Sequence, residues 1–356
     1  FKSITAYRDL DSTAFLDIDA TEWELGDVFV DIDQNQFSQE FQLLGDNGDN
    51  VNWVAGAYYL NEEITSHQEA YADDFLIYVT TPITFLRTID DDLNTKSYAV
   101  FGQIDWRFAD AWNLGLGIRY TKEEKDYFRT TSTFSNILGN IDPAFAFTDS
   151  DSWSDWTPTI TLDYDMNDNV RLYGRIANGF KSGGFNGRAN TADDVSAFDP
   201  ETVWTAEIGA KTRSSDGRLQ ANFALFQSTY DDFQARVSVG DGIDFRFPVL
   251  NAAELDTSGA ELELSWLPVD ALALGAQIGY LDSEYDEFIE NGVDVKDFKD
   301  VPYAPENTAS VTLDWAVFAL NWGNLDFHLD WSYNDEYVPY IEPSQNATSQ
   351  IDSYDI

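Results

Sequence analysis

The sequence predicts an all-β protein, a transmembrane antiparallel β-barrel of the up-and-down type with about 14 strands. Three observations lead to this prediction. Apolar and polar residues alternate over long segments, aromatic residues stand at the ends of the apolar faces, and short connectors alternate with long polar ones.

Composition narrows the classes of function. The 356 residues include 20 Lys plus Arg against 64 Asp plus Glu, a formal net charge of −44, which excludes nucleic acid as a partner. The chain has no Cys and only 2 His, so disulfides, thiolate zinc sites and cysteine nucleophiles are excluded. We expect no catalytic residue, no metal site and no cofactor.

The alternation has a period of two residues, which is typical of a strand with two different faces. In segment 112–121, one face carries Leu114, Leu116, Ile118 and Tyr120, and the other carries Asn113, Gly115, Gly117, Arg119 and Thr121. The same division recurs in segments 157–165, 261–266, 272–280 and 325–334. A soluble β-sandwich also alternates, so this pattern alone does not decide between the two folds.

Strand length and aromatic placement favour the membrane barrel. Several runs reach roughly 9 to 11 residues, enough for a tilted strand to cross a bilayer, whereas strands of soluble proteins average about 5 to 6. Aromatic side chains end the apolar faces at Trp106, Trp112, Tyr120, Trp266, Trp315, Trp322, Trp331 and Tyr333. Such positions are typical of the girdles at the two membrane interfaces, and a hydrated lumen accepts the polar face.

The lengths of the connectors predict which rim of the barrel is periplasmic and which is external. Short connectors are expected at 109–111, 167–169, 214–217, 268–271 and 320–324. Long polar stretches are expected to be external loops at 122–155, 181–200, 231–257, 282–307 and 334–349. Barrels of the outer membrane combine short periplasmic turns with long extracellular loops in this way.

Several segments resemble known ligand-binding or catalytic motifs but do not match them. The segment GFKSGGFNG at 179–187 matches neither phosphate-binding glycine pattern. Asp163, Asp165 and Asn167 begin like an EF-hand loop, which then lacks its Gly and its final Glu. Glu261 with Glu263, and His328 with Ser332, make no convincing hydrolase site. The acidic segment 282–300 leaves a divalent-cation site open.

The order of several segments resembles the barrel of TonB-dependent receptors. The densest match is VRLYGRIANGFKSGGFNGR at 170–188. Others are FSQEFQL at 37–43, WVAGAYY at 53–59, KSYAVFGQ at 96–103, LGIRYTKEEK at 116–125, PETVWTAEIGAK at 200–211, LFQSTYDDFQ at 225–234, GAELELSWL at 259–267 and YAPEN at 303–307. Each segment is weak alone, and the resemblance lies in their ordered set.

This resemblance implies that residues 1–356 are part of one β-barrel domain, in a family whose barrels have about 22 strands. It implies an N-terminal plug with a TonB box and further C-terminal strands, none of which is visible in the chain. The expected function is active uptake of a scarce nutrient, chiefly a ferric siderophore, across the bacterial outer membrane, energised by the inner-membrane TonB system. A passive porin-like channel is the alternative.

The expected partners are TonB, an iron–siderophore complex or another small nutrient, and outer-membrane lipid with lipopolysaccharide. Four residues of the densest segment are candidates for ligand contact at the barrel mouth, namely Lys181, Arg188, Asn186 and Arg175. Arg236 and Arg246 could extend the basic patch that begins with Lys181 and Arg188. The sequence does not indicate which nutrient is carried.

Overall fold

The computed structural model describes residues 1–17, 26–48, 50–72, 84–140, 145–187, 197–237, 248–339 and 351–355. These residues form one large antiparallel sheet with a single short 3-10 helix, η3 (Lys296–Phe298). None of the described helices is long and apolar enough to span a membrane.

The strands follow one another along the chain with a simple up-and-down order. They are β1 (Lys2–Asp17), β2 (Asp27–Asp46), β3 (Val51–Ala72), β4 (Phe85–Ala109), β5 (Trp112–Ser135), β6 (Gly139–Asn140), β7 (Phe145–Asn167), β8 (Val170–Lys181), β9 (Glu201–Arg213), β10 (Leu219–Arg236), β11 (Val249–Val269), β12 (Leu272–Glu290), β13 (Val293–Asp294), β14 (Asn307–Leu320), β15 (Gly323–Tyr337) and β16 (Ile351–Asp355). Of these 16 strands, β6 and β13 are two-residue strands that pair only with β5 and β12, so the other 14 strands form one continuous path. The predicted strand number and all-β fold are confirmed.

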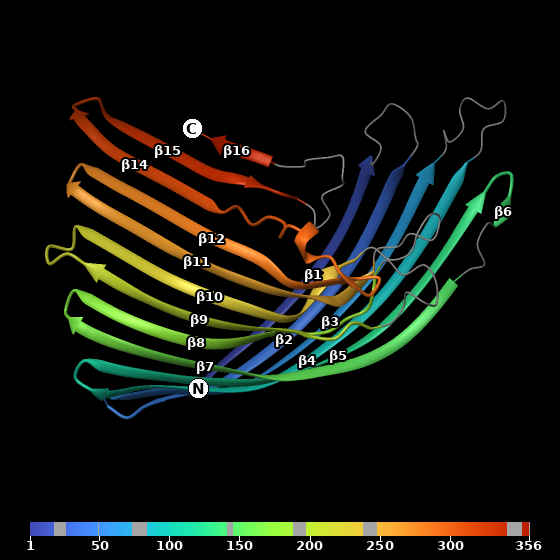
Figure 1. Cartoon of the computed structure of the whole chain (residues 1–356), viewed down its shortest axis with the longest axis horizontal. Helices are drawn as coiled ribbons and strands as arrows, with labels where there is room; N and C mark the ends of the chain where they lie inside the picture. The colour runs from blue at the N-terminus through green and yellow to red at the C-terminus, as the bar shows by residue number, and fades with distance from the viewer. Residues whose placement is uncertain are drawn as a thin grey trace.

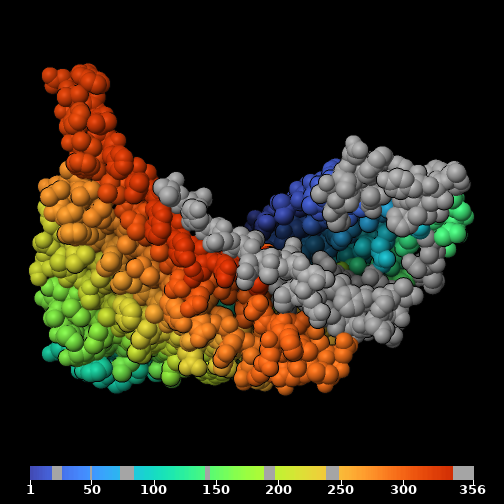
Figure 2. Space-filling model, turned by 45° about the horizontal axis from the view of Figure 1, so that its top comes forward, coloured from blue at the N-terminus to red at the C-terminus, as the bar shows by residue number. Residues whose placement is uncertain are grey.

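The sheet curls into an open trough, seen in Figure 1 and as a hollow in Figure 2. Among the described residues, β1 pairs only with β2 and β16 only with β15, so these two strands are the edges of the trough. Hollows in the sheet are lined by the polar face, with Arg119, Thr159 and Gln277 among the lining residues. The polar face is therefore the concave one, and we call it the lumen wall.

The convex face carries an apolar band between two rows of aromatic rings, which β5 and β7 show most clearly. Trp112 lies opposite Tyr164 with ring centroids 4.5 Å apart, and Tyr120 lies opposite Trp156 at 4.9 Å. Eight residues separate the two rows on β5, about 26 Å along a strand, or about 20 Å of height at a tilt near 40°. This spacing is close to the apolar band of an outer-membrane barrel, so the predicted girdles are confirmed on these strands.

Side chains within this band face outward with nothing packed on them. Leu116 is 44% exposed and its register partner Ile160 is 52% exposed, although both are aliphatic. Buried apolar side chains gather instead beyond the band, where Ala235, Val237, Leu255, Tyr285 and Phe288 join the ends of β10, β11 and β12. An aliphatic surface of this extent is stable only against lipid, because in water it would favour association.

The five predicted short turns are confirmed, and all lie at one end of the strands (Figure 1). The predicted external loops are shorter than expected, which corrects the sequence analysis. In the stretch 122–155, β5 and β7 stay paired from Lys122 opposite Ser154 to Thr131 opposite Phe145. Backbone hydrogen bonds do not depend on side-chain polarity, and water solvates both faces of a polar strand, so pairing continues beyond the membrane.

The same extension shortens three other predicted loops. β10 continues to Arg236 and β11 begins at Val249, β12 continues to Glu290, and β15 continues to Tyr337. Only the stretch 181–200 agrees with its prediction in the described part, where the strands end at Lys181 and resume at Glu201.

This topology predicts where protease cuts the protein on intact cells. Cleavage is expected around Asn291 and Gly292, an exposed hairpin tip at the end opposite the short turns, because exposed tips admit a protease. Residues 122–131 should resist, since their backbone is paired on both sides. Mass spectrometry of the released peptides locates the cuts. Cleavage at 214–217 in intact cells would invert the topology.

Candidate functional site

The lumen wall holds a shallow cavity of about 450 Å³ whose lining combines two guanidinium groups, two carboxylates and three threonines. Arg119 on β5 donates from Nε to Oγ1 of Thr121 at 3.0 Å, and its guanidinium carbon lies 5.5 Å from the ring of Tyr58 and 5.6 Å from that of Phe101. These contacts hold the group by cation–π attraction without neutralising it.

Arg175 lines the same cavity from β8, between Thr161 on β7 and Glu207 on β9. The Glu207 carboxylate already accepts a hydrogen bond, because Tyr173 donates its hydroxyl to Oε1 of Glu207 at 2.6 Å. Arg175 itself is exposed. The cavity therefore offers cationic donors to a solute in the lumen.

Above the cavity, residues 182–187 leave the end of β8 and fold back onto the lumen wall, and we call them the mouth turn. Phe185 stacks on Tyr127 with ring centroids 5.4 Å apart and planes 13° apart. It also meets Phe147 and Trp153 edge-on, at 6.4 Å and 6.2 Å. Aromatic packing with these three rings holds the turn inside the mouth.

Polar contacts fix the base of the mouth turn. The Lys125 ammonium donates to Oγ of Ser182 at 2.8 Å and to the Gly183 carbonyl at 2.7 Å, and it pairs with Glu123 at 3.3 Å. The Gln234 side-chain amide donates to the Ser182 carbonyl at 3.0 Å, which ties the turn to β10. Two distant strands thus hold one turn across the mouth.

A buried ion pair lies next to this aromatic cluster. Arg129, 2% exposed, donates to both carboxylate oxygens of Asp91 at 2.7 and 2.9 Å, and Tyr127 donates its hydroxyl to Asp91 at 2.6 Å. Burial, with the hydrogen bond to Asp91, raises the pKa of the Tyr127 phenol, which stays protonated. The pair gives the turn a rigid floor.

The glycines of the mouth turn have a packing reason. A Cβ on Gly183 would lie 2.3 Å from the Phe198 carbonyl and 2.5 Å from the Trp153 ring, whereas one on Gly187 meets nothing within 4 Å. Gly183→Ala is expected to loosen the turn, while Gly187→Ala leaves it unchanged. Hydrogen exchange of residues 180–187 in the full-length protein measures this. Equal protection in both variants would contradict the packing.

The four residues predicted to contact the ligand do not lie together. Lys181 ends β8 with its side chain 61% exposed and lies 3.5 Å from the carboxylate of Glu201. Asn186 belongs to the mouth turn but is only 4% exposed, and Arg175 lies lower, on the cavity. Arg188 and Arg246 lie outside the described residues. The structure thus places Lys181 at the end of β8, Asn186 in the mouth turn that follows it, and Arg175 on the wall below.

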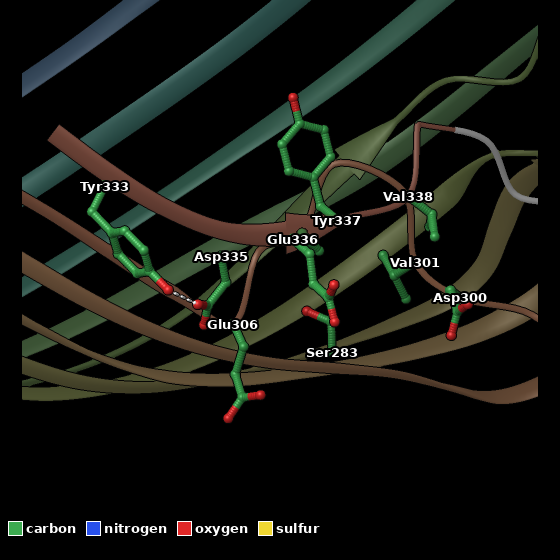
Figure 3. Close-up of a pocket in the computed structure, with 10 residues that line it drawn as sticks. Ser283, Asp300, Val301, Glu306, Tyr333, Asp335, Glu336, Tyr337 and Val338 are labelled. Atoms are coloured by element: carbon green, nitrogen blue, oxygen red, sulfur yellow. Dashed lines mark hydrogen bonds between the residues drawn. The ribbon is translucent and has the colours of Figure 1, made fainter. Parts of the chain in front are cut away.

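A second cavity, of about 540 Å³, lies near the far ends of β12 and β15 and is acidic (Figure 3). Asp300, Glu306, Asp335 and Glu336 line it, and Tyr333 donates its hydroxyl to Asp335. Among the described residues, which include all of 282–300, no three or more carboxylate or imidazole groups converge well enough to hold a metal ion.

Sequence reasoning missed Arg119, Lys125 and the Arg129–Asp91 pair. Their positions depend on strand register, which brings together residues up to 58 positions apart. A weak signal was present: Lys125 and Arg129 share the alternation of Arg119, so all three fall on the lumen face.

Comparison with known proteins agrees with the fold and the lumen wall. Residues 2–356 match the family described as TonB dependent receptor-like, beta-barrel. The chain belongs to this family, whose members are transport receptors of the outer membrane of Gram-negative bacteria.

Individual relatives are similar over part of their length. The pesticin receptor of Yersinia enterocolitica is 28% identical over 250 residues, which cover 68% of this chain and 33% of that receptor. The ferric yersiniabactin uptake receptor FyuA from Yersinia pestis superposes with a TM-score of 0.76 at 19% identity, covering 94% of this chain and 47% of that one. The ferric citrate transporter FecA superposes with a TM-score of 0.61 at 14% identity, covering 94% of this chain and 46% of that one. The chain thus spans about a third of the curated relative.

Proposed function

We propose that the receptor containing this chain imports a ferric siderophore or a similar iron complex across the outer membrane, driven by TonB. Family membership and the names of its relatives, receptors for pesticin and for ferric yersiniabactin, support this proposal. The chain would form part of one barrel domain, completed by further strands and by a plug that contacts TonB. No step of this function needs a catalytic residue.

The observation that carries the proposal is the cationic set above and on the lumen wall, in which Lys181 and Arg175 are exposed and Arg119 is half-buried. In a chain of net charge −44, Lys181 faces the mouth while Arg119 and Arg175 line one cavity below it. An iron complex wrapped in oxygen ligands presents acceptors, and guanidinium and ammonium groups are donors without acceptor capacity. The acidic remainder of the wall would discourage other small anions.

The passive channel remains the competing function, and energy dependence separates the two. The test deletes the receptor gene in its host and restores it in cells with and without TonB, using radioactive iron bound to each siderophore of a defined panel. Active uptake predicts accumulation of at least one complex only where both receptor and TonB are present. Equal uptake without TonB would establish a channel, and no uptake of any iron complex would exclude iron as cargo.

A further inference from the structure

Two lysines on the convex face lie just beyond the aromatic row nearest the mouth. That row includes Tyr59, Tyr98, Tyr120 and Trp156 on β3, β4, β5 and β7. Lys96 precedes Tyr98 by two residues on β4, and Lys122 follows Tyr120 by two on β5, so each lysine is on the same face as its tyrosine. Both lie one pleat farther from the apolar band.

Register places the two lysines side by side. Lys122 is directly opposite Tyr98, and Lys96 is directly opposite Glu124. Lys96 and Lys122 are therefore diagonal neighbours, at about 7 to 8 Å between backbones, a gap that two flexible ammonium groups can close around one phosphate. The Lys122 side chain is 43% exposed.

The position of the two lysines along the strands determines which part of the membrane they contact. Aromatic girdles lie at the level of the lipid headgroups, so a charge one pleat outward meets headgroup phosphates. Along the convex face, the adjacent positions are neutral at Asn61 and Ser154 and acidic at Glu124. The two lysines therefore form a local excess of positive charge over one carboxylate.

We propose that Lys96 and Lys122, with the hydroxyls of Tyr98 and Tyr120, bind a phosphate of an outer-leaflet lipid headgroup. The site rests on the membrane placement of the sheet and does not depend on the cargo. Glu124 opposes it, because its Oε1 accepts a hydrogen bond from the Lys122 ammonium at 2.6 Å. Each ammonium has three donors, so Lys122 keeps two for a phosphate while paired.

This site predicts that removing the lysines and removing the Glu124 carboxylate change lipid binding in opposite directions. Replacing both lysines, as Lys96→Gln with Lys122→Gln, should weaken binding of diphosphoryl lipid A about ten- to thirtyfold, since each of the two basic groups near an anionic lipid surface strengthens binding by a similar factor. Glu124→Gln should strengthen binding, because it removes the competing carboxylate. Lys296→Gln, on the lysine that begins η3 and pairs with Asp286, is the matched control and should leave lipid A binding unchanged.

The test titrates the detergent-purified full-length receptor with diphosphoryl lipid A and counts bound lipid by native mass spectrometry. Heat-modifiable gel mobility verifies that each variant is folded, and lipid A stripped of phosphate is the second probe. The proposal expects the order Glu124→Gln, wild type, double lysine variant, with differences that vanish for the dephosphorylated lipid. Wild-type affinity in the double variant, an equal loss in Lys296→Gln, or differences that persist without phosphate would each overturn it.

Discussion

Arginine in place of Leu116 is expected to destabilise the receptor by about 2 to 4 kcal/mol, the cost of a cation near the midplane of a bilayer, and arginine in place of Leu162, which lies nearer an interface, is expected to destabilise it by less. Both leucines point outward, 44% and 40% exposed, but only Leu116 lies midway between the aromatic rows, whereas Leu162 lies one pleat from the row of Trp112 and Tyr164. A guanidinium there has neither water nor an acceptor. The substitution therefore destabilises the folded, inserted state.

Thr159→Arg is the matched control on the opposite face of β7. Its register partners are Gly117 and Ala177, so the lumen wall has room for a longer side chain, and water solvates the charge. We expect a change within about 0.5 kcal/mol, as for an ordinary surface substitution. Urea unfolding of the full-length receptor in phospholipid vesicles measures all three variants. Equal losses on the two faces would contradict the assignment of the convex face to lipid.

Asp91→Ala is expected to cost about 3 to 5 kcal/mol, because it leaves the Arg129 guanidinium buried without its counter-charge. Arg129 is 2% exposed and both oxygens of Asp91 accept from it, while Tyr127 loses its acceptor as well. The mouth turn should loosen at the same time, since Phe185 stacks on Tyr127.

A solvent-exposed pair provides the comparison. Arg171 donates to Asp165 at 2.6 Å near a short turn, with side chains 47% and 29% exposed, and Asp165→Ala should cost about 1 kcal/mol or less. Replacing both buried partners, as Asp91→Leu with Arg129→Met, should restore most of the stability lost in Asp91→Ala. Thermal unfolding of the full-length receptor in detergent ranks the variants. A loss in Asp91→Ala no larger than in Asp165→Ala would show that the buried pair is unimportant.

The faces of the strands and the short turns could be predicted from sequence because both are local. Alternation assigns Leu116 to lipid and Arg119 to the lumen without knowledge of any neighbouring strand. The turn before Val170 needs only its run of Asp and Asn residues. These features required no tertiary information, and the structure agrees with them.

The mouth could not be predicted in the same way. Lys125 and Gly183 meet only because β5 and β8 lie in one sheet, and the inward fold of Phe185 depends on three rings from two strands, β5 and β7. The polar ends of β5 and β7 resemble loops in composition, yet backbone pairing extends them. Long-range register, and not local preference, decides these parts.

Spin-label accessibility along β5 tests the central claim most directly, that this sheet is a membrane barrel wall with a lipid face and a water face. The chain has no cysteine, so single cysteines at positions 113 to 121 of the full-length receptor, with any others outside the chain replaced, can be labelled in vesicles. We expect collisions with oxygen to peak at 114, 116 and 118, and collisions with a water-soluble nickel complex to peak at 113, 115, 117 and 119. Equal water accessibility of both faces, without a period of two, would contradict the account.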